Sequence, residues 1–284
     1  FYPGCTLHST GVEFGLSTQL VCHALDIDLV EIPDWNCCGA SSAHSMDETL
    51  FLSLPARNFA QAQQLDLDTL AIPCAACFSR LSAADLALQQ DAQFRAQMEE
   101  TLDFQYQDRV RPRNLLDILA NDFSSSALAT PIQKPLEGLK VVSYYGCLLV
   151  RPPQYTHRWD DPEHPQTMDH LLQLMGAEAV PWSYGTDCCG GSLTLNRSDV
   201  VVHLVDRLAR AAHEAGADAF VTACPMCMAN VDGRQKYRGG PPLPRPPKPD
   251  YEPLPIFYFT ELMALAYNLP MHKALAKHLV DPRP

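Results

Sequence analysis

The sequence predicts an α/β fold that is built twice, as two domains related by duplication. Three observations support this prediction. Most of the eleven cysteines follow one pattern that occurs twice, short apolar runs end just before the cysteine clusters, and helical stretches separate these runs. Strands that alternate with helices are typical of largely parallel sheets, in which sites form at the carboxyl ends of the strands.

The expected strands are short runs rich in apolar and β-branched residues. They cover residues 28–32, 69–72, 140–144, 177–180 and 219–222. Longer stretches between them have helical character, at residues 12–25, 50–64, 200–215 and 260–267. The segment 121–138 contains three consecutive serines and two prolines, so we expect it to link the two halves. The predicted domains are residues 1–134 and 135–284.

Ten cysteines form the repeat, which consists of a single cysteine, a vicinal pair and a C-x-x-C motif. The two sets are Cys5, Cys37, Cys38, Cys74 and Cys77, and then Cys147, Cys188, Cys189, Cys224 and Cys227. Equivalent cysteines lie 142 to 151 residues apart, and an insertion of about nine residues near 152–162 explains most of the mismatch. The neighbours repeat as well, since each vicinal pair is followed by a glycine. We therefore infer an internal duplication.

The cysteine count limits the chemistry. Zinc is commonly bound by two C-x-x-C motifs, and a thioredoxin-like dithiol uses one. Five cysteines per copy exceed the four thiolates that zinc or a cubane [4Fe–4S] cluster takes, and a dithiol would leave most of them without a role. Iron–sulfur chemistry is favoured, while a zinc site and simple dithiol exchange remain as alternatives. Both C-x-x-C motifs are expected at strand-to-helix turns, where the helix N-terminus stabilises a thiolate.

With these motifs, the chain resembles the duplicated cysteine-rich CCG domain of the heterodisulfide reductase B subunit over nearly its whole length. The resemblance implies two Rossmann-like CCG domains related by a pseudo-twofold axis, with clusters at the carboxyl ends of the strands. It also implies that the five cysteines of each copy hold one noncubane [4Fe–4S] cluster. The spacing before the vicinal pair is longer in the second copy than in the first. The exact way in which the second copy binds its cluster can therefore differ from the family pattern.

The family implies that the chain is the catalytic subunit of an electron-transfer complex, reducing a disulfide or oxidising thiols. Two clusters facing one pocket could each supply an electron and each capture one sulfur, which is our hypothesis for the duplication. The alternatives are a subunit that only relays electrons, in a lactate-oxidising or benzoyl-CoA-reducing assembly, and a zinc-stabilised structural subunit.

The sequence contains no G-x-G-x-x-G motif, no P-loop and no ferredoxin cysteine run. We expect no flavin or nicotinamide on this chain. Electrons should come from a separate subunit. In the resembling complex, one companion subunit is a ferredoxin-type iron–sulfur protein and another carries flavin, so these are the expected partners.

Charge and hydropathy restrict the partners further. The net charge of −12 has the wrong sign for binding nucleic acid through its phosphates. No apolar run is long enough for a membrane span, and the first residues lack the features of a secretory signal. A cytoplasmic protein is therefore expected.

A few residues outside the repeat are further functional candidates. His8 and His44 lie near cluster cysteines and could donate a proton to a departing thiolate, and Arg151 could meet an anionic group of the substrate. Each is more commonly a surface residue. Cys22 lies in an apolar helical stretch and is expected to be buried in the core. The segment 239–255 contains eight prolines and is expected to be extended, either as a surface connection or as an arm against a partner.

Overall fold

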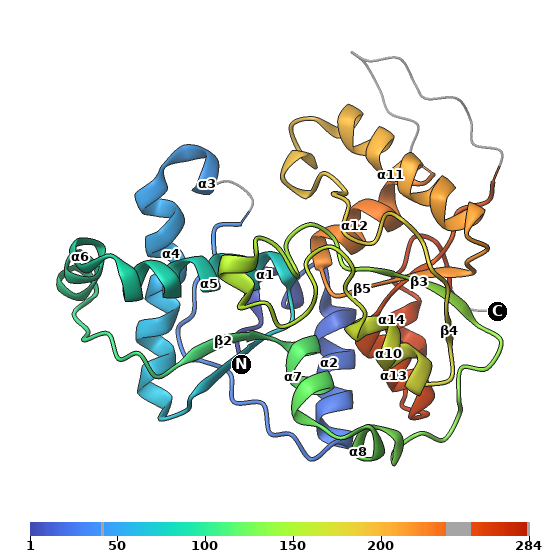
Figure 1. The fold of residues 1–284 in the computed structure, drawn as a ribbon, viewed down its shortest axis with the longest axis horizontal. Helices are drawn as coiled ribbons and strands as arrows, with labels where there is room; N and C mark the ends of the chain where they lie inside the picture. Colours follow the sequence, from blue (N-terminus) through green and yellow to red (C-terminus); the bar gives the residue numbers. More distant parts are fainter. Residues whose placement is uncertain (41–42, 237–250, 283–284) are drawn as a thin grey trace.

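The computed structural model describes residues 1–284 apart from 41–42, 237–250 and 283–284, and apart from the side chains of residues 44 and 45 (Figure 1). In the second half, four parallel strands form a sheet in the order β4-β3-β5-β6. They are β3 (Lys140–Tyr144), β4 (Glu178–Ala179), β5 (Ala219–Thr222) and β6 (Ile256–Tyr258). Every residue of β5 and all but the first of β3 are buried, as expected for a parallel sheet covered on both faces.

The first half repeats this arrangement with fewer assigned strands. Its parallel pair consists of β1 (Thr69–Ile72) and β2 (Arg111–Asn114). The Tyr2 N–H donates to the Ala71 carbonyl at 2.9 Å, and the Ile32 N–H donates to the Phe1 carbonyl at 3.0 Å. In the second half, the Val180 N–H donates to the Val141 carbonyl in the corresponding way, at 2.8 Å. The first half thus has a two-stranded sheet, and these two hydrogen bonds place residues 1–2 beside β1 and residue 32 beside Phe1.

The predicted strands at 69–72, 140–144 and 219–222 are confirmed, and the one at 177–180 is shortened to β4. The prediction of a strand at 28–32 was wrong in the strict sense, because no strand is assigned there. The Ile32 N–H donates to the Phe1 carbonyl, but the segment 28–32 does not form the regular ladder of hydrogen bonds that defines a strand.

The helices of the first half lie mainly to the left and at the centre of Figure 1. They are α1 (Gly4–Leu7), α2 (Val12–Ala24), α3 (Ala43–Met46), α4 (Glu48–Ala62), α5 (Ala75–Gln90), α6 (Ala92–Leu102), α7 (Leu115–Asp122) and α8 (Ser125–Ala129), with the short 3₁₀ helix η1 (Gln63–Leu65). Helix α4 begins two residues before the predicted start, because the Asp47 carboxylate accepts the Leu50 N–H at 2.8 Å and caps it.

The helices of the second half lie mainly at the centre and on the right of Figure 1. They are α9 (Pro153–Thr156), α10 (Thr167–Leu174), α11 (Ser198–Glu214), α12 (Pro225–Arg234), α13 (Phe259–Ala266) and α14 (His272–Leu275), with the 3₁₀ helix η2 (Gly191–Leu193). All four predicted helices are confirmed, as α2, α4, α11 and α13, with ends displaced by one or two residues.

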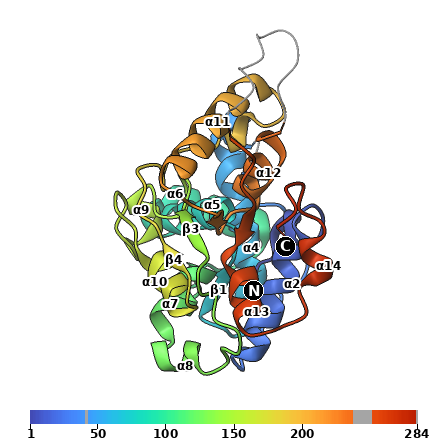
Figure 2. The same ribbon diagram turned by 90° about the vertical axis from the view of Figure 1, so that its right-hand side faces the viewer.

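Two equivalent helix pairs join the halves. Helix α2 packs on α13, and α10 packs on α7. Because α2 and α10 follow the single cysteine of each copy, and α7 and α13 follow the last strand of each copy, the two contacts are related by the pseudo-twofold axis. Figure 2 shows α2 beside α13 from a second direction. The hydroxyls of Ser17 and Thr260 lie 2.7 Å apart in this buried interface.

The segments predicted as irregular are partly ordered. The link at 121–138 contains the end of α7 and all of α8, and the N–H groups of Gln133 and Lys134 both donate to the Ala266 carbonyl at 2.9 Å. In the insertion near 152–162, α9 packs against α5 of the first half. Of the proline-rich segment 239–255, residues 239–250 lie outside the described residues. The last part of this segment is held by a hydrogen bond in which the Leu254 N–H donates to Gln235 Oε1 at 2.9 Å.

Candidate metal centres

The cysteines lie at the carboxyl ends of the strands. Cys74 and Cys224 are the N-cap residues of α5 and α12, which directly follow β1 and β5. The single cysteine of each copy follows a glycine with a left-handed backbone, Gly4 (φ +68°) or Gly146 (φ +66°). A Cβ atom on Gly146 would lie 2.9 Å from the Sγ of Cys227, so only glycine lets the backbone approach this sulfur.

The sulfurs pair in the same way in both copies. In the first copy, Cys5 and Cys37 Sγ lie 3.8 Å apart, and Cys38 and Cys77 Sγ lie 3.2 Å apart. In the second copy, the equivalent pairs are Cys147 with Cys188 at 3.6 Å and Cys189 with Cys227 at 3.7 Å. The structure therefore gathers these predicted site residues within each half.

The remaining cysteine of each copy lies where the two halves meet. The Cys74 and Cys224 thiols lie close enough to affect each other's pKa, which is raised for Cys74 and lowered for Cys224. Beside them, the Ala75 N–H donates to the Ala223 carbonyl at 3.2 Å, which joins the two C-x-x-C loops. The symmetry-related hydrogen bond cannot form, because Pro225 replaces Ala75 in the second copy and has no N–H. The two cysteine sets therefore face each other across the pseudo-twofold axis.

The first cysteine of each vicinal pair has a lowered pKa. Hydrogen bonds from Cys38 and Cys5 lower the pKa of Cys37 to about 2, against the effect of burial. A hydrogen bond from Cys147 lowers the pKa of Cys188 to about 6, and the Gly190 N–H, 3.2 Å from its sulfur, adds to this effect. Thiolate is the form of cysteine that binds metal, so these positions favour a bound group.

The last cysteine of each copy behaves differently. Hydrogen bonding to Cys38 and Cys74, together with burial, raises the pKa of Cys77, and the pKa of Cys227 is raised in the same way by Cys189 and Cys224. A raised pKa keeps these buried thiols protonated as long as no metal is bound. A metal that binds these sulfurs must displace the protons, so its binding is expected to depend on pH.

The donor set fits a polynuclear iron–sulfur group better than a single ion. The repeated motif of each copy supplies five sulfur ligands, and no histidine or acidic residue repeats with it. A ligand set made of sulfur alone suits soft metals and iron–sulfur clusters. Among the described residues, no group of three or more histidine, cysteine or acidic side chains is arranged to hold one metal ion. Sulfurs that gather as separated pairs are compatible with ligands that each bind a different iron.

The other sequence candidates lie outside this arrangement. His8 is exposed, stacks on Trp35 with ring centroids 5.5 Å apart, and lies 3.4 Å from Glu31. The guanidinium of Arg151 donates to Glu163 and Thr186, both at 2.8 Å. These hydrogen bonds link the insertion to the loop before the second vicinal pair. The side chain of His44 lies outside the described part of the structure. Cys22 is buried in the core, as predicted, and burial raises its pKa to about 12.

Sequence reasoning missed a residue at equivalent positions of the two C-x-x-C helices. Arg80 and Asn230 each stand three residues after the last cysteine of their copy, which places them one turn further along the same helix face. Asn230 donates to the Cys189 carbonyl at 3.2 Å and lies 3.5 Å from its sulfur. The spacing of three residues was the signal that could have identified them.

Arg80 also lines a cavity between the copies. This cavity has a volume of about 160 Å³ and is bounded by all five cysteines of the second copy together with residues of the first. The first copy contributes Ala40, Ala75, Ala76 and Arg80. The second cysteine set therefore opens toward the first half of the chain.

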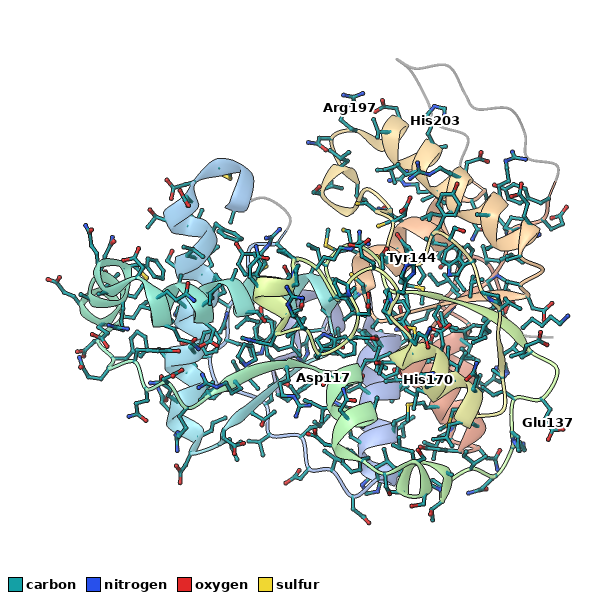
Figure 3. All side chains as sticks on the ribbon, viewed as in Figure 1. Asp117, Glu137, Tyr144, His170, Arg197 and His203 are labelled. Carbon is teal, nitrogen blue, oxygen red and sulfur yellow. The ribbon has the colours of Figure 1, made fainter. Side chains whose placement is uncertain are left out.

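A larger polar cavity of about 630 Å³ lies beside the sheet of the second half. Tyr145, Asp169, His170 and Trp182 are among its lining residues, and the Tyr145 hydroxyl donates to Asp169 at 2.7 Å. Burial raises the pKa of Asp169. Figure 3 shows His170 on α10, while Arg197 and His203 lie far from it near the start of α11. No sequence motif indicated this cavity.

Known proteins resemble the chain in the segments that carry the cysteines. The family model described as CCG, cysteine-rich domain, matches residues 1–82 and 141–232, which together exceed half of the chain. A relative named 8-methylmenaquinol:fumarate reductase membrane anchor subunit, from Wolinella succinogenes, is 28% identical, covering 99% of this chain and 95% of the relative. Another, the B subunit of ferredoxin:CoB-CoM heterodisulfide reductase from Methanosarcina mazei, is 27% identical, covering 93% and 87%.

A solved structure resembles the fold alone. The crystal structure of a hypothetical protein from Helicobacter pylori matches with a TM-score of 0.77 at 13% sequence identity, covering 99% of this chain and 52% of that one. Among the described residues, none of the helices combines the length and apolar character needed to cross a bilayer.

Proposed function

The chain belongs to the cysteine-rich CCG domain family, and from this premise we propose that it is the catalytic iron–sulfur subunit of a heterodisulfide-reductase-like electron-transfer complex. In this role it reduces a disulfide, or oxidises thiols, between two noncubane [4Fe–4S] clusters. The observation that carries the proposal is the meeting of two equivalent five-cysteine sets through their C-x-x-C loops. The likeness to the B subunit of a heterodisulfide reductase supports the same assignment.

The proposed ligands are the ten cysteines of the repeat, five for each cluster. When bound, each cluster would supply one electron to the disulfide and hold one of its sulfurs. The protein positions the thiolates: Gly4 and Gly146 let the backbone approach the sulfurs, and the N-termini of α5 and α12 orient N–H groups toward them. Disulfide reduction consumes two electrons and two protons and yields two thiols, so two one-electron centres match the stoichiometry.

The proposed reaction needs an electron source outside this chain. Because no ferredoxin or nucleotide motif was found in the sequence, we assign this role to two partners, a ferredoxin-type iron–sulfur protein and a flavin-containing protein. We place the complex in the cytoplasm. The division of the chain into domains at residues 134 and 135 is part of the same proposal.

Anaerobic purification followed by metal analysis tests the proposal. We expect about eight irons per chain and no zinc, with electron paramagnetic resonance signals from two clusters. Turnover with a reduced viologen dye should convert a small disulfide to thiols. One cluster per chain, or stoichiometric zinc, would contradict the proposal.

A second candidate function is an electron relay between a hydroquinone and a partner enzyme. The likeness to a quinol:fumarate reductase subunit over 99% of the chain favours it. The polar cavity of about 630 Å³ near Tyr145, two residues before Cys147, is large enough for a substituted ring. Oxidation of a soluble menaquinol analogue without any disulfide turnover would favour this candidate over the first.

A further inference from the structure

The insertion of the second copy forms one wall of the polar cavity of about 630 Å³. Residues 163–166 line this wall, while β3, α10 and the segment 179–186 supply the rest of the lining. The Asp160 carboxylate holds the insertion on α10, since it accepts the Thr167 N–H at 2.9 Å and the Gln166 N–H at 3.2 Å. The first copy has no such insertion, so the cavity belongs to the second copy alone.

Two hydroxyl groups and a carboxyl group lie together on the buried side of the cavity. The Tyr145 hydroxyl donates to Asp169 at 2.7 Å. Ser143 is only 2% exposed, and its hydroxyl has no hydrogen-bond partner among the described residues. Burial raises the pKa of Asp169, and the Ser143 hydroxyl is near enough to oppose this effect without completing a hydrogen bond. A buried hydroxyl without a partner is costly, and a ligand in the cavity would supply one.

The first copy shows that these polar side chains are not needed to place the cysteines. Counted back from the single cysteine of each copy, Ser143 and Tyr145 correspond to Phe1 and Pro3. Neither of these side chains can form a hydrogen bond, yet the sulfurs pair in the same way in both copies. The polar groups of the second copy therefore call for a role of their own.

The cavity is acidic. Among the described residues that line it, Glu163 and Asp169 are carboxylic acids, and there is no lysine or arginine. Arg151 pairs with Glu163 at 2.8 Å, whereas Asp169 forms no ion pair with an arginine or lysine of the described part of the chain. His164 and His170 line the cavity as exposed residues, and Figure 3 shows His170 on α10. Asp169 thus lacks a permanent counter-charge.

Trp182 adds an aromatic side chain to the lining. Its Nε1–H donates to the Ser143 carbonyl at 3.0 Å, and its ring packs edge-on against Phe220 with centroids 5.8 Å apart, which fixes the indole in place. Aromatic rings attract organic cations. The volume of about 630 Å³ is that of a site for a small organic ligand and exceeds what a single metal ion needs.

We propose that this cavity binds a small organic cation, an amine with an apolar body, through the Asp169 carboxylate and the Ser143 hydroxyl. The ammonium group would supply the counter-charge of Asp169 and a hydrogen-bond partner for Ser143, while the apolar body packs on Trp182. The inference goes beyond the proposed function and does not depend on it, because the described lining includes none of the ten cysteines assigned to the clusters.

Three ring compounds that differ in charge test the proposal. They are 2-phenylethylamine (cationic), 2-phenylethanol (neutral) and 3-phenylpropionate (anionic). Their binding to the oxidised, cluster-loaded protein is measured by anaerobic titration calorimetry at neutral pH. We expect the wild type to bind the amine about 10- to 100-fold more tightly than the alcohol, and the carboxylate most weakly.

Variants locate the preference. Asp169→Asn should remove it, while the amide oxygen can still accept from Tyr145. Ser143→Ala should weaken amine binding about 5-fold without lowering the melting temperature, because this hydroxyl has no hydrogen bond to lose. The matched control is Asp206→Asn on α11, since Asp206 also accepts a tyrosine hydroxyl, from Tyr251 at 2.8 Å, but does not line the cavity. It should keep the preference.

The outcomes separate this inference from the proposed function. Equal binding of the amine and the alcohol by the wild type would overturn it, even if Asp169→Asn failed to fold. So would tighter binding of the alcohol, which would assign the cavity to neutral rings such as the hydroquinone of the second candidate function, or an amine preference that persists in Asp169→Asn. If the amine is preferred but no disulfide turns over, the amine site stands and the proposed reaction fails.

Discussion

The rings of Phe14 and Tyr258 stack in parallel across the interface between the two copies, with centroids 4.1 Å apart and an interplanar angle of 2°. Phe14 belongs to the first long helix after Cys5, whereas Tyr258 ends the last strand of the second half. Both side chains are fully buried. The contact lies close to the second C-x-x-C loop, because a Cβ atom on Gly11 would meet both the Tyr258 hydroxyl, at 3.3 Å, and Pro225, at 3.6 Å.

Replacing Phe14 by alanine should lower the free energy of unfolding by about 3–5 kcal/mol, because a fully buried ring is removed from a packed interface. The measurement is denaturant unfolding of the cluster-loaded protein under anaerobic conditions. Phe94→Ala is the matched control, since Phe94 lies on α6 and is only partly buried. If both variants lost the same free energy of unfolding, packing at the interface would contribute no more to stability than packing at the surface helix α6.

Each vicinal pair should serve only its own cluster. Cys38→Ser is expected to remove or remodel the first cluster and Cys189→Ser the second, because the sulfur contacts of these residues stay within one copy. Iron content should fall by about half in each variant, and disulfide turnover should be lost in both. Cys22→Ala should keep the full iron content. Full turnover by either serine variant with half the iron would exclude a reaction that needs both clusters.

The left-handed glycine before Cys147 should be required for the second cluster. Gly146→Ala brings a Cβ atom within 2.9 Å of the Cys227 sulfur, whereas a Cβ atom on Gly138, with φ +84°, would have nothing within 4 Å. Both substitutions cost about 1–2 kcal/mol in backbone conformation. Only Gly146→Ala should also reduce the iron content, as measured by metal analysis. Similar iron contents in both variants would contradict the close approach of backbone and sulfur.

A buried pair at the C-terminal end makes stability depend on pH. Burial is the largest single effect on the pKa of His278 and lowers it, but the hydrogen bond to Glu261 at 3.0 Å and the charges of Glu261, Asp232 and Glu13 together raise the pKa above the usual value. The pair therefore contributes stability below the pKa of an unfolded histidine, about 6.5, and the contribution is lost as pH rises through the raised folded value.

The test compares the melting temperatures of the wild type and His278→Gln across pH. The difference should be largest near pH 6 and should shrink toward pH 9. His8→Gln is the control, because the pair of His8 with Glu31 is exposed and screened by solvent. A difference that does not change with pH would show that His278 acts through packing alone.

The cysteine positions and most of the sheet could be predicted from the sequence, because local signals determine them. The strand before each C-x-x-C motif is a short apolar run, and the place of the cysteines in the fold follows from its end. The segment 28–32 has the same apolar character but forms no strand, because a strand also needs a ladder of hydrogen bonds to another segment, which local composition does not determine.

Contacts between the two halves could not be predicted from the sequence. The contact of Ala75 with Ala223, and the place of Arg80 in a cavity of the other copy, depend on how the two halves dock. Arg151 was considered for anion binding because it follows Cys147 closely. In the structure, Arg151 forms an ion pair with Glu163 of the insertion. Such an ion pair is known only once the chain is folded.

The equivalence of the two interhelical contacts, α2 with α13 and α10 with α7, has a consequence for the origin of the chain. Two contacts exchanged by a twofold axis are what an isologous homodimer presents. An ancestral polypeptide of half this length would have formed the same interface between two identical protomers, with both cysteine sets already facing each other. Fusion of two such copies would free each half to change alone, in keeping with Pro225 and Asn230 in one copy where the other has Ala75 and Arg80.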